Sequence, residues 1–134
     1  MEEKTRPCDL PTTAALAYLG DAVHTLDIRR RAVALGLTKS GRLHAFTTAL
    51  VNAPAQAAML AALQGVLTEE EADLCRRAAN SKHLQAPKHA TSTEYQSATA
   101  FEALLGMHAY LGDDERLAEL LELSYRSTEG RKEK

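Results

Sequence analysis

Hydrophobic residues recur at helical spacing throughout this sequence, and no segment shows the strict alternation of a half-buried strand. The first such stretch carries its large apolar residues three or four positions apart, at Leu16, Leu19, Val23 and Leu26. Glycines, prolines and capping residues divide the chain into separate helices. We therefore predict an all-α fold of about six helices, at roughly 12–36, 40–50, 52–65, 68–79, 93–111 and 113–127.

The length of 134 residues is that of one domain. We expect 1–134 to form a single domain with frayed ends at 1–10 and 128–134, as chain ends commonly are. A hydrophobic content of 45% and a charged content of 25% indicate a globular chain. Two cysteines fit neither a disulfide framework nor a metal-ligand spacing. Since no apolar run could span a bilayer and no signal segment is recognised, we expect a cytoplasmic protein without membrane association.

Two acidic residues, Asp21 and Glu102, lie on otherwise apolar helix stripes. The first helix is apolar on two sides, which is typical of a central helix. A buried carboxylate is costly unless it is protonated, paired or bound to a cation. A divalent cation would neutralise two facing carboxylates, and oxygen ligands without His or Cys favour Mg²⁺ or Mn²⁺. Structural pairing of each acid with an arginine, or an Asp21 that is half exposed, fits the periodicity as well.

The sequence around both acids resembles the catalytic domain of ribonuclease III. YLGDAV at 18–23 is similar to the core of that domain's signature, and TAFEALLG at 99–106 is similar to its second acidic helix. The segments around and between them resemble the Mini-III branch, which lacks a double-stranded-RNA-binding domain. The resemblance implies an all-helical homodimer that cuts double-stranded RNA with Mg²⁺, with Asp21 and Glu102 as the catalytic and metal-binding acids. It also implies maturation of the 5′ and 3′ ends of the 23S ribosomal RNA precursor.

The chain departs from the broader ribonuclease III pattern at several acidic positions. That pattern has acids where this chain has Ala14, Ala17 and Thr99, and another near Ser40 or Arg42. The Mini-III branch shares several of these losses. We therefore expect one well-held Mg²⁺ per site, with Mn²⁺ as a substitute and any second ion bound mainly by RNA phosphate.

Three further residues near the acids have expected roles. Tyr95 and Thr99 lie on the Glu102 side and are predicted to donate hydrogen bonds that orient this carboxylate. His24 lies one turn from Asp21 and is interpreted as a structural partner rather than a proton-transfer group.

Basic residues are concentrated in particular segments, although the net charge is −2. No acid occurs between Leu74 and Thr93, and this stretch contains a long loop of the kind that is commonly functional. We predict that it binds RNA through Arg76, Arg77, Asn80, Lys82, His83 and Lys88. Because A-form duplex is recognised through phosphates, 2′-hydroxyls and shape, base specificity should be low, and RNA shape or a nearby ribosomal protein would select the site. The arginines at 29–31 are expected to be largely solvated.

A two-fold dimer would place two acid pairs across one duplex. We expect the first helix and the region around Leu43, Phe46 and Leu50 to contribute to the interface. Two other functions stay open. A non-catalytic ribonuclease III-like module that binds structured RNA or the ribosome is favoured by the missing acids, but the retained Asp21 and Glu102 argue against it. A helical phosphohydrolase acting on nucleotides would need His-Asp pairs, and the sequence has no HD dipeptide.

Overall fold

The computed structural model describes residues 10–81 and 92–132. Within them, all regular structure is helical. The helices are α1 (Thr13–Ala34), α2 (Ser40–Leu50), α3 (Ala53–Leu63), α4 (Glu69–Ala79), α5 (Ser92–Leu111) and α6 (Asp114–Lys132). The all-α prediction is confirmed, and the predicted bounds agree with the observed ones to within a few residues, except at the end of the last helix.

Capping residues and glycines set several of these bounds. At the start of α4, the backbone N–H of Thr68 donates to Glu71 Oε1 at 2.9 Å and the N–H of Glu71 donates to Thr68 Oγ1 at 3.1 Å. This is the capping box that the sequence pattern predicts. After α1 and α5 the chain turns at Gly36 and Gly112, whose φ angles of +89° and +72° lie in the left-handed region that favours glycine.

The last helix continues further than the sequence analysis predicts. Fraying was expected from Thr128, whereas α6 extends to Lys132. The side chain of Thr128 is buried, and its hydroxyl donates to the carbonyl of Tyr125 at 2.7 Å. Tertiary packing therefore holds this turn in place. Leu10 is also among the residues predicted to fray, but its side chain is half-buried against the core. The other residues predicted to fray, 1–9 and 133–134, lie outside the described part of the chain.

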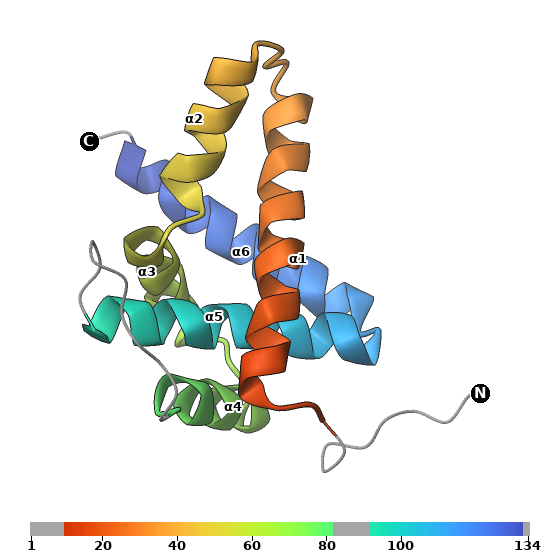
Figure 1. Cartoon of the computed structure of the whole chain (residues 1–134), viewed down its shortest axis with the longest axis vertical. Coiled ribbons are helices and arrows are strands. Elements are labelled where there is room, and N and C mark those ends of the chain that lie inside the picture. The colour runs from red at the N-terminus through yellow and green to blue at the C-terminus, as the bar shows by residue number, and fades with distance from the viewer. Residues whose placement is uncertain (1–9, 82–91, 133–134) are drawn as a thin grey trace.

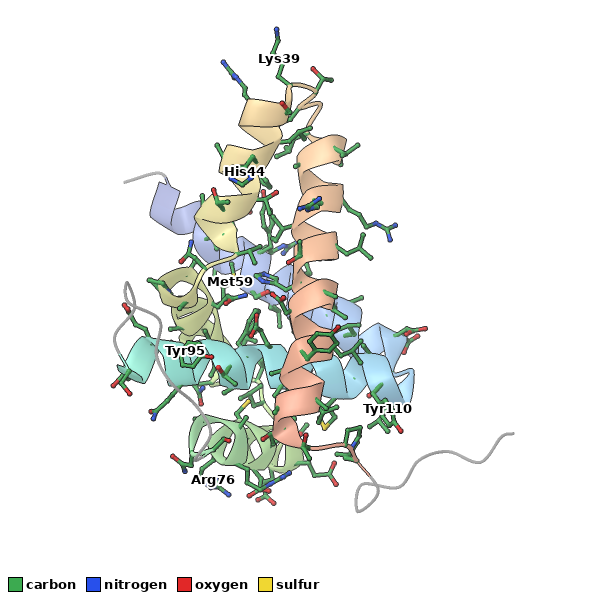
Figure 2. The ribbon with its side chains drawn as sticks, in the orientation of Figure 1. Lys39, His44, Met59, Arg76, Tyr95 and Tyr110 are labelled. Carbon is green, nitrogen blue, oxygen red and sulfur yellow. The ribbon has the colours of Figure 1, made fainter. Side chains whose placement is uncertain are left out.

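The C-terminal half of α1 and the helix α2 form a hairpin whose tip extends away from the other helices (Figure 1). Lys39 lies at the tip of this hairpin (Figure 2). A groove of about 370 Å³ runs between the two helices and is lined by residues such as Val33, Leu43 and His44. Among the described residues, no single helix is long and apolar enough to cross a membrane. Only α2 and α3 taken together, with a bend of 53° between them, meet that criterion, by length and composition alone.

The helix α5 lies at the centre of the fold and packs against α1, α3, α4 and α6 (Figure 1). Every residue from Ala98 to His108 except Glu102 is buried. The expectation that the first helix is central is wrong. The helix α1 covers one side of α5 and leaves much of its own outer face exposed. Burial on both sides within this chain therefore does not explain why α1 has a second apolar stripe.

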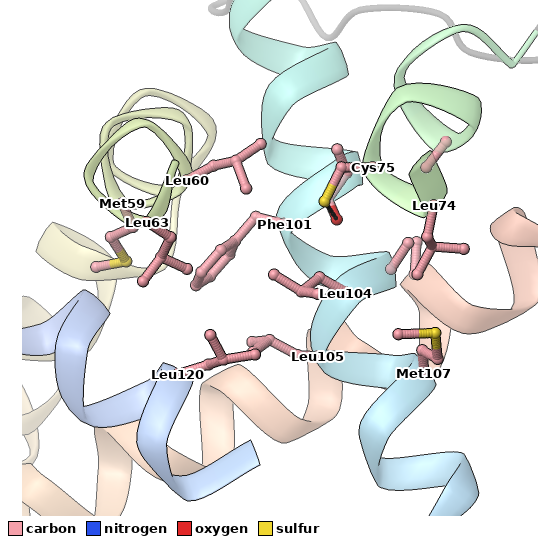
Figure 3. Packing of buried hydrophobic residues seen from close by; sticks show 14 of the residues in the cluster. Met59, Leu60, Leu63, Leu74, Cys75, Phe101, Leu104, Leu105, Met107 and Leu120 are labelled. Atoms are coloured by element: carbon pink, nitrogen blue, oxygen red, sulfur yellow. Dashed lines mark hydrogen bonds between the residues drawn. The ribbon is translucent and has the colours of Figure 1, made fainter. Parts of the chain in front are cut away.

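The hydrophobic core gathers around α5 (Figure 3). Side chains of α5 meet apolar residues of α3, α4 and α6, and the largest of these are almost completely removed from solvent. Each fully buried side chain of this size stabilises the fold by roughly 1.5–3 kcal/mol. The residues are Phe101, Leu104 and Leu105 of α5, Met59, Leu60 and Leu63 of α3, Leu74 and Cys75 of α4, and Leu120 of α6.

A buried polar network joins α4, α5 and α6. Glu71 is only 2% exposed, and it accepts hydrogen bonds from Arg116 Nη2 at 2.7 Å, Arg116 Nε at 2.8 Å and His108 Nε2 at 2.7 Å. The hydrogen bonds from Arg116 are the main reason that the pKa of Glu71 falls to about 2. The other ring nitrogen of His108 lies 3.0 Å from a carboxylate oxygen of Asp113. These pairs fix the relative positions of the three helices.

The helices α1 and α5 cross at a reciprocal pair of glycines. A methyl group on Gly20 would lie 1.7 Å from the carbonyl oxygen of Glu102, and one on Gly106 would lie 1.8 Å from the carbonyl oxygen of Leu16. At each glycine, the backbone of the opposite helix thus occupies the space that the side chain of any other residue would fill. The two backbones therefore approach closely at the positions next to Asp21 and at Glu102.

We predict that Gly20→Ala lowers the free energy of unfolding by at least about 2 kcal/mol, because the added methyl group forces α1 and α5 apart. Gly41→Ala in α2 is the matched control. No atom lies within 4 Å of its added methyl group, so this variant should be unchanged or up to about 1 kcal/mol more stable. Thermal unfolding followed by circular dichroism measures both, and equal midpoints for the two variants would contradict the close crossing.

Candidate functional site

The crossing of α1 and α5 brings Asp21 and Glu102 together. Asp21 follows Gly20 directly in α1, and Gly20 contacts the backbone of Glu102 in α5. The two carboxyl groups form a hydrogen bond with each other. The structure therefore places these two predicted site residues, which are far apart in the sequence, side by side.

The surroundings of Glu102 disfavour its negative charge. Its side chain is half-buried, and burial is the largest cause that raises its pKa to about 8. The negative charge of Asp21 and the hydrogen bond with Asp21 raise it further, while a hydrogen bond with Gln56 acts in the opposite direction. Without a counter-charge, Glu102 is therefore largely protonated at neutral pH.

Asp21 itself is exposed. Of the alternatives that the sequence leaves open, the structure thus favours a partly buried Glu102 and an Asp21 that solvent reaches. The contact with α5 runs along Leu16 and Gly20, and Asp21 lies at the edge of this contact rather than inside it. The site is consequently open to solvent on the Asp21 side.

The donor set fits a hard divalent cation. Both acids offer oxygen atoms, and a cation between them would relieve the repulsion that raises the pKa of Glu102. In residues 10–81 and 92–132, no group of three or more His, Cys, Asp and Glu side chains gathers in a way that could hold a metal ion. Two carboxylates would leave several coordination positions for water or substrate oxygens, as Mg²⁺ sites commonly do.

A third residue, Gln56 of α3, belongs to this site although the sequence analysis does not single it out. Its side chain is 4% exposed and forms a hydrogen bond with Glu102. One feature of the sequence could have identified Gln56. It is the polar residue in an otherwise apolar run, APAQAAML at 53–60. Such a residue is buried only if it has hydrogen-bond partners.

His24 is the second partner of Gln56. Its Nδ1 lies 3.0 Å from Gln56 Nε2, and its ring packs edge-on against Phe101 with 5.0 Å between the ring centroids. The side chain is 1% exposed, and this burial lowers the pKa of His24 to about 4. The imidazole is therefore neutral at physiological pH. This agrees with the interpretation of His24 as a structural partner.

Comparison with known proteins decides the family. The ribonuclease III domain family matches residues 14–113, a span that contains both acids of the site. This chain belongs to the ribonuclease III family. The resemblance stated from the sequence is therefore confirmed.

Curated relatives place the chain in the Mini-III branch of the ribonuclease III family. Mini-ribonuclease 3 of Brevibacillus brevis is 39% identical over 129 residues, which cover 96% of each chain. Mini-ribonuclease 3 of Symbiobacterium thermophilum is 43% identical over 116 residues, 87% of this chain and 88% of the relative. A crystal structure of a Fusobacterium nucleatum protein superposes with a TM-score of 0.78 at 30% identity, over 87% of this chain and 93% of the other.

The other expected partners of Glu102 lie on its own helix. Thr99 is buried, and Tyr95 is half-buried nearer the start of α5 (Figure 2). Their role in orienting the carboxylate stays a prediction. The neutral side chain that forms a hydrogen bond with Glu102 in the structure is that of Gln56, which lies on a different helix.

The predicted RNA-binding residues lie only partly within the described chain. Arg76, Arg77 and Asn80 are exposed at the C-terminal end of α4. Arg76 lies at the opposite end of the molecule from Lys39 at the tip of the α1–α2 hairpin (Figure 2). Both arginines pair with Asp73, with Arg77 Nε 3.0 Å from its Oδ2. An acid one turn away thus offsets part of the positive charge here. The other three predicted residues, Lys82, His83 and Lys88, lie outside the described residues.

Arg31 has a structural role within the run of three arginines. Its Nε lies 2.8 Å from Asp27 and its Nη1 lies 3.1 Å from Glu122 of α6. The guanidinium carbon is also 4.4 Å from the ring centroid of Tyr125. Arg31 therefore attaches α1 to α6, whereas the preceding two arginines are exposed.

We predict that, without divalent cations, stability falls as the pH rises from about 6.5 to 8. Between about 4.5 and 6.5 the loss from Glu102 is offset by His24, whose pKa of about 4 in the folded protein lies below its ordinary value of 6.5. The folded state holds a proton on Glu102 up to a pKa of about 8, whereas the unfolded chain releases it near 4.5. Raising the pH from about 6.5 to 8 therefore favours the unfolded state. Added Mg²⁺ should restore stability at pH 8.

Urea unfolding in EDTA across this pH window tests the prediction. Glu102→Gln should reduce the pH dependence, and the exposed-acid control Glu115→Gln should leave it as in the unmodified protein. An unchanged slope in Glu102→Gln would show that this carboxyl group does not titrate as the structure indicates.

Proposed function

We propose that this chain is an Mg²⁺-dependent endoribonuclease of the ribonuclease III family that cleaves double-stranded RNA, with Mn²⁺ able to substitute. We also propose that it acts in the cytoplasm on the ends of the 23S ribosomal RNA precursor. The observation that carries the proposal is the pairing of Asp21 and Glu102 at the α1–α5 crossing. The curated relatives named Mini-ribonuclease 3 support the choice of an RNA substrate.

Hydrolysis of a phosphodiester adds water across a P–O bond, so the attacking water loses a proton and the leaving oxygen gains one. A bound Mg²⁺ would supply Lewis acidity and lower the pKa of a coordinated water. Asp21 and Glu102 would hold it, and the exposure of Asp21 leaves room for an RNA phosphate beside the pair. His24 is not the proton carrier in this proposal, because it is buried, neutral and engaged by Gln56.

We propose that the RNA backbone follows the exposed end of α4 and the segment after it. Arg76, Arg77 and Asn80 supply exposed donors there, and Lys82, His83 and Lys88 continue the basic sequence. Such contacts recognise phosphates and duplex shape rather than base sequence. The choice of cleavage site then depends on RNA shape or on a ribosomal protein bound nearby.

The outer face of α1 supports a homodimer. Exposed apolar residues follow one another at helical spacing along this face, and the largest, Tyr18, is 84% exposed. They are Ala15, Tyr18, Ala22, Leu26 and Val33. A second copy packed on this stripe would bring two Asp21–Glu102 pairs to one duplex and explain the second apolar side of the helix.

The three α2 residues that we expect near the interface lie partly inside the protomer. Leu50 is buried in the protomer's own core, and Phe46 is half-buried against it. Leu43 lines the groove between α1 and α2. The exposed apolar surface available to a partner is thus mainly that of α1.

We predict a dimer in sedimentation velocity experiments at micromolar concentration. Ala22→Arg, which places a charge in the centre of the α1 stripe, should shift the protein to a monomer. Ala118→Arg on an exposed part of α6 makes the same chemical change elsewhere and should stay dimeric. A monomeric profile for the unmodified protein would contradict the proposed assembly.

We predict Mg²⁺-dependent cutting of a long RNA duplex by the purified protein, no cutting in EDTA, and no cutting of single strands. Asp21→Asn and Glu102→Gln should each lower the rate by about 100-fold or more, because each removes one of the two charges that hold the cation. Asp114→Asn, a change at an exposed acid of α6, is the matched control and should cut normally. Circular dichroism should confirm that all variants are folded.

Binding of duplex RNA without cutting in any divalent metal would overturn the proposed activity. It would instead identify the chain as a non-catalytic module for structured RNA. In that case the acids absent at Ala14, Ala17 and Thr99 would explain the loss of chemistry.

A further inference from the structure

The amide of Gln56 lies between two side chains that come from two other helices. Its Nε2 is 3.0 Å from Nδ1 of His24 in α1, and the same amide forms a hydrogen bond with the carboxylate of Glu102 in α5. A primary amide has two N–H donors on one nitrogen. A charged Glu102 can only accept, and when the amide nitrogen donates to it, His24 Nδ1 is the acceptor of the second N–H, so both N–H groups of Gln56 are used.

This arrangement fixes which way the amide faces. If the amide were reversed, its carbonyl oxygen would face the oxygens of a charged Glu102, as this group would be beside a cation, and that contact would be repulsive. The His24 ring cannot turn freely, since it is 1% exposed and packs edge-on against Phe101. The buried His24 ring therefore holds the amide nitrogen of Gln56 in the place where it faces Glu102.

The backbone of Gln56 is also held firmly. It lies in the first half of α3, where the Asn52 side chain accepts a hydrogen bond from the N–H of Ala55 at 2.9 Å and Pro54 occupies the first turn. The next turn of α3 places Met59 and Leu60 in the core against α5. The amide is thus presented to Glu102 from a rigid element.

We propose that Gln56 is a positioning residue, whose amide, oriented by His24, fixes the Glu102 carboxylate beside Asp21 in the geometry that a divalent cation requires. The inference rests on the proposed function, because it concerns the cation that this function needs. Outer partners of metal ligands typically contribute about 10–100-fold to metal affinity. We expect an effect of that size here.

The test measures Mn²⁺ affinity without RNA, from the electron paramagnetic resonance signal of free Mn²⁺. Gln56→Met keeps the length of the side chain and removes both donors, and it should weaken Mn²⁺ binding about 10-fold. Gln64→Met is the matched control at the exposed end of α3 and should bind Mn²⁺ as the unmodified protein does. In cleavage assays, Gln56→Met should need about 10-fold more Mg²⁺, with the KM for RNA unchanged at saturating Mg²⁺.

A second variant keeps the inference testable if Gln56→Met does not fold. His24→Leu leaves Gln56 in place but removes the acceptor that orients it, and it should also weaken Mn²⁺ binding several-fold. Unchanged Mn²⁺ affinity in the folded variants would overturn the positioning role. Weaker binding in Gln56→Met alone would overturn the part assigned to His24.

The same measurements separate this inference from the proposed function. If the unmodified protein binds Mn²⁺ through Asp21 and Glu102 but cuts no duplex, the nuclease proposal fails, and weaker binding in Gln56→Met still supports the positioning role. If the unmodified protein binds no Mn²⁺ at all, the positioning role is overturned as well.

Discussion

The close approach of α1 and α5 at Gly20 and Gly106 is the constraint on which the site depends. With any larger residue at either position, the carbonyl oxygen of the opposite helix would lie inside the added side chain. The two helices cross where their backbones nearly touch, and Asp21 and Glu102 are the residues next to that contact. The glycines are thus needed for the geometry of the acids as much as for the packing of the helices.

Holding two carboxyl groups together is unfavourable, and the rest of the fold has to offset it. The pKa of Glu102 rises to about 8 because this group is half-buried beside Asp21. Elsewhere, the core around Phe101 and the buried pairing of Glu71 with Arg116 stabilise the same helices. A fold can keep such a costly pair when distant interactions exceed its cost, and this is typical of a functional site rather than a structural one.

The sequence predicts the helices well because caps and glycines are local signals, as at Thr68 and Gly36. It also identifies Asp21 and Glu102, since an acid in an apolar stripe can be recognised without tertiary structure. It leaves open whether Asp21 is exposed, and it does not predict that Gln56 joins the site, because both depend on how α3 and α1 pack on α5. The extra turn at Thr128 was missed for the same reason, since burial in the tertiary structure outweighs a polar, charged local sequence.

The most direct test of this account is a crystal structure of the protein with Mn²⁺, in which anomalous scattering locates the metal. The account predicts one well-occupied ion bonded to an oxygen of Asp21 and an oxygen of Glu102, with the Gln56 amide still donating to Glu102. Full occupancy at another place, or no ion between the two acids at millimolar Mn²⁺, would contradict it. Either result would mean that the glycine crossing brings the two acids together for a reason other than metal binding.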